Sequence, residues 1–309
     1  MKLLPIAKTI AAATLLFAVA DSKAQTCSCA GVPLLGAMEL ATPGDGKWFL
    51  ASTYEYHDAS LLVRRSNTVP NSPGRERTSE VLLLETSRRL IGKLSFSALL
   101  STVKHDRKVG GVHDSASGLG DAIIILKYAP VSITPFSRNA FSVGLGARLP
   151  IGQDDVTSDE VVLAEDLQPS TGANAGIIWL YAARALNEPA TARIYANATY
   201  TNNGDNVRNY QFGHETTVSF GASYQMQSPW GLNAELLYRQ TERDERALSP
   251  IPNTGGEWLD FVPAVQYHVN DSLALRVSGK IPVRRNLNDQ LQFTTKYSVR
   301  LTLSYVFGN

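Results

Sequence analysis

The chain has 309 residues, a net charge of +1 and 18% charged residues, so no strong overall field directs it toward nucleic acid or an acidic partner. Its length allows one large domain or two ordinary ones. Beyond the N-terminal region, apolar runs such as those at residues 81–84 and 122–126 are far shorter than the ~18 residues that a membrane-spanning helix needs. The sequence has no phosphate-binding glycine loop, zinc-binding helix or basic and aromatic stripe for nucleic acid.

The N-terminus has the pattern of a secretory signal. Lys2 and Lys8 precede the apolar stretch 10–20, and small residues follow at Ser22 and Ala24. We predict that residues 1–24 are a signal peptide, which places the mature protein in the cell envelope or outside the cell.

Residues 25–45 are predicted to be a periplasmic segment that carries Cys27 and Cys29. Two thiols one residue apart bind a soft metal, form a strained disulfide or pair with another chain, and the sequence leaves these alternatives open. A complete metal site is absent locally, because no histidine or third cysteine lies nearby. We therefore predict no cofactor and no metal, with Cys27 and Cys29 as the candidate ligands of any metal that binds.

From residue 46 onward, stretches of about ten residues alternate in polarity and are separated by turns or loops. Twelve such stretches begin near Trp48, Ser79, Lys93, Asp121, Ala140, Ala173, Thr191, Thr216, Trp230, Trp258, Ser272 and Lys296. About ten residues is the length that a tilted strand needs to cross a bilayer. Long polar connections, among them residues 105–120 and 152–172, alternate with mostly short ones, which is typical of bacterial outer-membrane barrels.

Each stretch has an apolar face on which aromatic residues gather at the two ends. Trp48 and Tyr181 lie at the short-turn end and Tyr56 at the long-loop end, with aliphatic residues such as Ile177 between these levels. Aromatic girdles around an aliphatic band are the pattern of a lipid-facing surface, whereas a secreted β-sandwich would place this face in its core. We therefore predict that residues 46–309 form one all-β domain. It is a 12-stranded antiparallel transmembrane β-barrel of the outer-membrane type, in the outer membrane of a Gram-negative bacterium.

The opposite face is predicted to enclose a hydrated lumen, because twelve strands enclose more space than side chains fill. Its predicted selectivity-setting residues are Asp121, Lys127, Arg148, Arg184, Arg193, Glu235, Arg239, Asp260, Arg276, Lys280, Lys296 and Arg300. The basic residues outnumber the acidic ones, which favours anionic solutes by electrostatic focusing. A ladder of paired charges that plugs the interior is the alternative reading, and a register shift of one residue would reverse a side chain's direction.

Residues 112–115 contain the residue types of nucleophilic catalysis. His113 and Ser115 lie two apart, so on one strand face they could form a base and a nucleophile. Outer-membrane phospholipase A, also a twelve-strand barrel, has a His-Asp-Ser-Asn-Gly motif, but Ala116 stands in place of its Asn. No third, orienting residue has a defensible position, so we predict a polar outer loop without catalysis and keep a lipid hydrolase as the less favoured alternative.

Three motifs in the middle of the chain resemble those of one family. They are Ser117-Gly118-Leu119-Gly120-Asp121 with Lys127-Tyr128, then GLGARLPIGQDD from Gly144, and LQPSTGAN from Leu167. Their order and spacing resemble the phenol meta-degradation pathway outer-membrane transporter family. Ile151 stands where that family has Thr, and Ser170 stands where it has the first Gly of Leu-Gln-Pro-Gly-Thr-Gly. The resemblance covers residues 117–184 and implies an outer-membrane barrel that passes small molecules, without naming the solute.

Together these patterns predict passive diffusion of small solutes, anionic or aromatic, through the lumen, without enzyme activity. The alternative is a closed barrel with a structural role, in which Cys27 and Cys29 dock a metal or a periplasmic partner. The predicted partners are outer-membrane lipid, a small-molecule solute and the barrel-assembly machinery, with no nucleic acid. Neither the solute nor the oligomeric state follows from the sequence.

Overall fold

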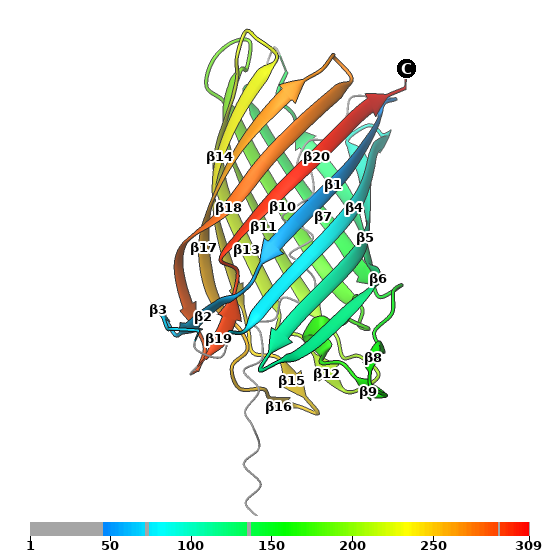
Figure 1. The fold of residues 1–309 in the computed structure, drawn as a ribbon. Coiled ribbons are helices and arrows are strands. Elements are labelled where there is room, and N and C mark those ends of the chain that lie inside the picture. Colours follow the sequence, from blue (N-terminus) through cyan, green and yellow to red (C-terminus); the bar gives the residue numbers. More distant parts are fainter. Residues whose placement is uncertain (1–45, 72–73, 135–136, 290, 309) are drawn as a thin grey trace, which may run out of the picture.

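The computed structural model describes residues 46–71, 74–134, 137–289 and 291–308, so the predicted signal peptide and the segment with Cys27 and Cys29 lie outside the described residues. Twelve strands close into one antiparallel barrel, in which β1 pairs with both β4 and β20 (Figure 1). The barrel strands are β1 (Trp48–Asp58), β4 (Glu76–Ile91), β5 (Leu94–Val109), β6 (Val112–Val131), β7 (Asn139–Leu149), β10 (Ala175–Ala185), β11 (Ala192–Asn203), β13 (Glu215–Gln225), β14 (Trp230–Thr241), β17 (Gly256–His268), β18 (Leu273–Leu287) and β20 (Tyr297–Phe307). In the described part of the chain, no helix has the length and apolar character to cross a membrane.

The predicted twelve-stranded barrel is confirmed, and eleven strands begin within three residues of their predicted starts. β6 is the exception, because it begins at Val112 and a two-residue turn joins it to β5. The prediction of a long loop at residues 105–120 is therefore wrong. A bulge explains the error: the register shifts opposite Gly120 and Asp121, so the alternation of polarity changes phase there.

The apolar face of most strands points outward, as predicted. Val265, Leu275 and Leu301 are 42%, 37% and 45% exposed on the outer surface. At the short-turn end, where the C-terminus lies (Figure 1), Tyr305 and Phe307 stack with ring centroids 5.7 Å apart. Exposed aliphatic side chains bounded by aromatic ones form a surface suited to lipid. Because outer-membrane barrels have their short turns on the periplasmic side, the short-turn end faces the periplasm.

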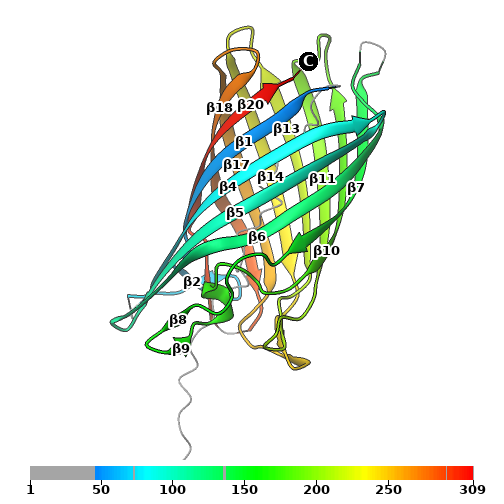
Figure 2. The same ribbon diagram turned by 90° about the vertical axis from the view of Figure 1, so that its right-hand side faces the viewer.

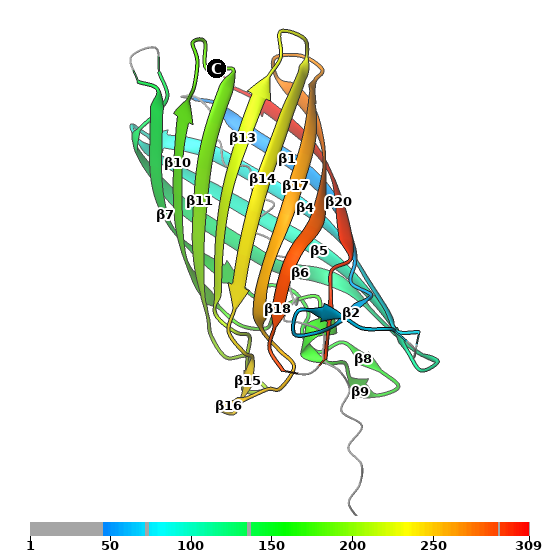
Figure 3. The same ribbon diagram turned by 90° about the vertical axis from the view of Figure 1, so that its left-hand side faces the viewer.

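The wall is uneven around the barrel. β4, β5 and β6 cross the front of the molecule obliquely and run beyond their neighbours at the long-loop end (Figure 2), while β13, β14, β17 and β18 form the opposite side (Figure 3). β6 has 20 residues and β7 has 11. Pairing between them begins at Ala122, so residues 112–121 of β6 have β5 on one side and the following loop on the other.

The long loops fold into small sheets that cap the outer mouth (Figure 1). These short elements are β2 (Leu61–Arg64), β3 (Asn67–Thr68) and β19 (Gln292–Thr294) in one sheet, β12 (Tyr210–Gln211), β15 (Glu245–Arg246) and β16 (Ser249–Pro250) in a second, β8 (Thr157–Ser158) with β9 (Val161–Val162), and the 3-10 helix η2 (Glu165–Leu167). Val63, Trp258 and Leu287 pack together beneath the first sheet, and Tyr210 packs against Phe212 in the second loop cluster. The cap is therefore a packed structure with its own apolar contacts.

Candidate functional site

One side of the lumen is lined by an apolar wall. Its residues, from β4, β5, β6 and β10, are Val81, Leu83, Leu99, Val103, Ile123, Ile125, Ile177 and Trp179. Lys127 lies within this wall, 2% exposed, with its Nζ 4.7 Å from the centroid of the Trp179 ring. The indole ring stabilises the buried ammonium by a cation–π interaction. The expectation of a polar interior is therefore wrong for this side of the barrel.

The apolar wall reverses the predicted orientation of β10. Trp179 stacks on Tyr181, which contacts Tyr195, so the odd-numbered residues of β10 point into the lumen. The prediction that Ile177 and Tyr181 face lipid is wrong. Arg184 consequently lies on the outer face, exposed, and the prediction that it lines the lumen is also wrong. The apolar-outward rule failed here because both faces of β10 are apolar.

The other side of the lumen borders a polar cavity of about 430 Å³, lined mainly by β11, β13, β14, β17 and β18. The Tyr195 ring lies over Gly221, where any side chain would collide with it. This position allows the Tyr195 hydroxyl to reach β14, where it donates to Glu235 Oε2 at 2.8 Å and accepts from Asn233 Nδ2 at 2.9 Å. Arg276 Nη2 approaches Asn233 Oδ1 at 3.5 Å, which extends the network to β18.

The structure places ten of the twelve predicted lining residues on the inner face. They are Asp121, Lys127, Arg148, Arg193, Glu235, Arg239, Asp260, Arg276, Lys280 and Arg300. Lys296 is exposed in the loop directly before β20, and Arg184 lies outside. The part that these residues take in selectivity stays a prediction.

Several inner-face acids escaped the sequence analysis, among them Glu55, Glu85 and Glu215. Glu55, 1% exposed, accepts from Arg300 Nη2 at 3.0 and 3.1 Å, and Glu215 lies 3.3 Å from Arg239 Nη1. A signal for Glu55 was present, because it alternates with Tyr54 on a strand whose even positions face outward. Paired charges therefore reduce the cationic excess that the inner basic residues alone would give.

Asp121 anchors the loop of residues 152–174 inside the barrel mouth. Its carboxylate, 4% exposed, accepts from Ser170 Oγ at 2.5 Å, Thr171 Oγ1 at 2.7 Å and Thr171 N at 3.2 Å. Arg148 Nε lies 3.2 Å from the same carboxylate. Asp121, Arg148 and the Ser170-Thr171 pair come from the three motifs singled out in the sequence, so these motifs share one physical role, which is to hold this loop.

Glycines permit the loop to approach the wall closely. A side chain on Gly120 would collide with Ser101 and crowd the carbonyl oxygen of Pro169, and one on Gly152 would collide with the backbone of Leu119. Leu163 to Ala173 are almost all buried beneath the long β5–β6 hairpin (Figure 2). These residues therefore narrow the outer mouth from within.

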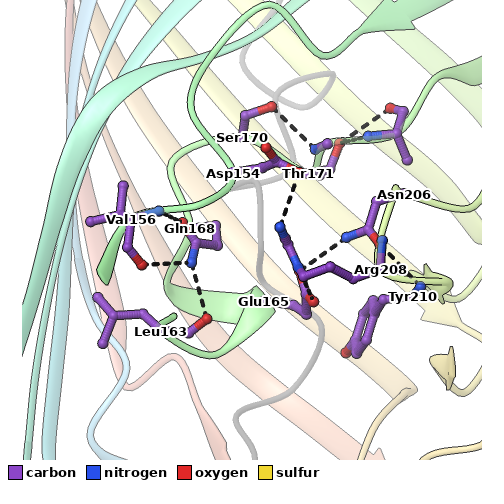
Figure 4. Close-up of polar contacts among 12 residues, drawn as sticks. Asp154, Val156, Leu163, Glu165, Gln168, Ser170, Thr171, Asn206, Arg208 and Tyr210 are labelled. Atoms are coloured by element: carbon purple, nitrogen blue, oxygen red, sulfur yellow. Dashed lines mark hydrogen bonds and ion pairs between the residues drawn. The ribbon is translucent and has the colours of Figure 1, made fainter. Parts of the chain in front are cut away.

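Glu165 is the main polar junction of this loop (Figure 4). Its side chain is 5% exposed, and it accepts from Arg208 Nε at 2.8 Å, Arg208 Nη2 at 2.6 Å and Asn206 Nδ2 at 3.0 Å. The neighbouring Asp166 accepts from Arg77 Nη1 of β4 at 2.6 Å. The carboxylate of Glu165 raises the pKa of Arg208. Loop residues have no periodic pattern, so no sequence signal identified these acids.

Tyr210 gives the cap a dependence on alkaline pH. Its hydroxyl donates to Asp244 Oδ2 at 2.7 Å, and burial, followed by the charge of Asp244, raises its pKa well above the ordinary 10.0. A tyrosine with a raised pKa stabilises the fold fully below pH 10.0, and that contribution is lost as the pH rises further toward the folded-state pKa.

We expect Tyr210→Phe to lower the free energy of unfolding by about 1.5–3 kcal/mol at neutral pH, the range for a hydrogen bond to a charged group. The difference between the two proteins should shrink above pH 10, when measured by calorimetry in detergent. Tyr200→Phe, an exposed residue of the outer surface, controls for the general alkaline effect. A difference that is constant up to pH 12 would contradict this account.

His113 and Ser115 lie in strand β6 rather than in a loop. They project from the outer face, where His113 Nε2 lies 3.1 Å from Asp106 Oδ1 of β5. Among the described residues, no hydrogen bond joins His113 to Ser115, so the base and nucleophile arrangement is not formed. The part of the chain that the structure describes also contains no group of three or more side chains suited to hold a metal ion.

Comparisons with known proteins agree with this fold. A COG4313 outer membrane channel from Pseudomonas putida F1 has a similar fold, with a TM-score of 0.72 at 12% identity, over 86% of this chain and 97% of the other. The β domain of the Bordetella autotransporter BrkA is similar at a TM-score of 0.52 and 12% identity, over 85% and 100% of the two chains. No curated protein sequence matches the chain. The model of the family described as "Putative MetA-pathway of phenol degradation" matches residues 76–301, most of the barrel, and the chain belongs to this family of outer-membrane β-barrels.

Proposed function

We propose that this barrel conducts small solutes passively across the outer membrane. The observation that carries the proposal is the polar cavity of about 430 Å³ within the lumen, beside the apolar wall. A pathway with one polar and one apolar side suits solutes that have both an anionic group and an apolar part. No chemical step is part of the proposal, because diffusion through a lumen requires none.

Residues 152–174 set the width of the outer mouth in this proposal. Their polar side chains are bonded to the barrel wall and to the neighbouring loops, which supports a permanent constriction rather than a loose loop. The solute therefore passes beside this loop, between the anchored Thr171 and the inner residues of β11 to β20.

Planar-bilayer recording tests the proposal with Arg276→Ser. A unit charge about 8 Å from an ion in water contributes about 0.5 kcal/mol, with opposite signs for an anion and a cation, so the ratio of anion to cation permeability should fall about fivefold. Arg184→Ser removes the same charge from the outer face and should leave the ratio unchanged. Absence of conductance with pure protein, or equal effects of the two variants, would contradict the proposal.

The alternative of a closed docking barrel has no described observation in its favour, since Cys27 and Cys29 lie outside the described residues. The lipid hydrolase alternative depends on a His113–Ser115 contact that the described strand β6 does not contain.

A further inference from the structure

A row of side chains crosses four adjacent strands on the outer face at the short-turn end. Register pairs Phe307 of β20 with Trp48 of β1, Trp48 with Arg88 of β4, and Arg88 with Phe96 of β5. Arg88 is the one charged residue of this row. Trp48 and Phe96 contact each other edge to face, with ring centroids 5.8 Å apart, so the row is packed together.

The guanidinium of Arg88 lies over the Trp48 ring, with its Cζ 4.9 Å from the ring centroid. Arg88 takes part in none of the ion pairs or hydrogen bonds found among the described residues. The guanidinium is therefore held in place on one face by an aromatic ring, while its five N–H donors have no acceptor in the part of the chain that the structure describes.

The opposite membrane interface provides a contrast. On the outer face of β5 at the long-loop end, Lys104 lies 3.2 Å from Asp106 and 3.5 Å from Glu80, and Lys108 lies 3.9 Å from Glu76. Cations there are neutralised by the protein itself. At the short-turn end Arg88 has no such counter-charge among residues 46–308 as far as they are described.

We propose that Arg88 and Trp48 form a binding site for the headgroup of an anionic phospholipid in the periplasmic leaflet. A lipid-facing charge is tolerated only near the interface, which is the level of this aromatic row. At that level the available anion is a lipid phosphate, and the planar guanidinium binds phosphate oxygens in a bidentate manner. Phe96 and Phe307 flank the site and contact the acyl chains.

Native mass spectrometry of the full barrel in mild detergent tests this site by titration with phosphatidylglycerol and phosphatidylethanolamine. The unmodified protein should retain phosphatidylglycerol preferentially, and Arg88→Gln should weaken that binding about tenfold, as expected for loss of a bidentate charge-assisted pair. Arg88→Lys keeps the charge but lacks the planar guanidinium, so its affinity for phosphatidylglycerol should lie between those of the unmodified protein and Arg88→Gln.

Arg184→Gln is the matched control, because Arg184 is an exposed arginine of the outer face near the same end but makes no cation–π contact with any described residue. It should leave phosphatidylglycerol binding nearly unchanged. The faster gel migration of unheated protein shows that each variant is folded. Equal binding of the two lipids by the unmodified protein, or equal losses in Arg88→Gln and Arg184→Gln, would overturn the proposal.

Discussion

Replacing Asp121 with Ala is expected to release residues 152–174 from the barrel mouth and to raise the single-channel conductance. The carboxylate is nearly fully buried and holds Ser170, Thr171 and Arg148. Its loss leaves the Arg148 guanidinium without its ionic partner, although Arg148 Nη2 keeps a bond to Asn203 Oδ1 at 3.0 Å. Removal of one partner of a buried pair costs about 3–5 kcal/mol, so the thermal midpoint should also fall.

Planar-bilayer recording measures the rise in conductance, and limited proteolysis within residues 152–174 measures the release of the loop. Asp121→Asn keeps the size of the side chain and one acceptor oxygen, so it should give a smaller rise in conductance. Thr171→Val removes one donor and should cost about 0.5–1.5 kcal/mol, the range for an ordinary hydrogen bond. Asp121→Ala could instead lower stability while the conductance and the protease sensitivity of the loop stay the same. That result would show that Asp121 stabilises the barrel wall without holding the loop in the mouth.

Replacing Arg300 with Met is expected to shift the selectivity of the lumen toward cations and to lower stability by about 3 kcal/mol. Arg300 binds both oxygens of Glu55, at 3.0 and 3.1 Å, and the variant leaves that carboxylate buried without its main counter-charge. His57 Nε2 also lies 3.0 Å from Glu55 Oε1. A lumen with Glu55 unmasked attracts cations, so the anion preference should fall more than it does in Arg276→Ser.

A double-mutant cycle separates the pair from its surroundings. Glu55→Gln combined with Arg300→Met removes both charges, so it should be more stable than Arg300→Met alone and should recover part of the anion preference. Urea unfolding in detergent and reversal potentials in a salt gradient provide the two measurements. Strictly additive effects of the two substitutions would show that the observed contact contributes nothing to either property.

Alternation of polarity was sufficient to predict the strands, their number and the outward direction of Leu275 and Leu301. The period of two is a local property, and a lipid-facing surface leaves it intact because most outward positions are apolar. The motifs around Asp121, Arg148 and Thr171 were also visible in the sequence. Their shared role in holding the loop was not visible, because it depends on contacts between distant residues, such as Asp121 and Thr171, which are 50 positions apart.

Tertiary structure alone decided three features of the site. The direction of β10 depended on whether Trp179 had an apolar wall to meet inside the barrel, since both faces of that strand are apolar. The bulge at Gly120 reversed the alternation of inward and outward side chains along β6, so the first nine residues of this strand were predicted to be a loop. Glu165 gained its role through Arg208, on a different loop, and loops have no period from which such a contact follows. In each case the deciding partner is distant in the chain, so the physical cause is closure of the barrel and not local sequence.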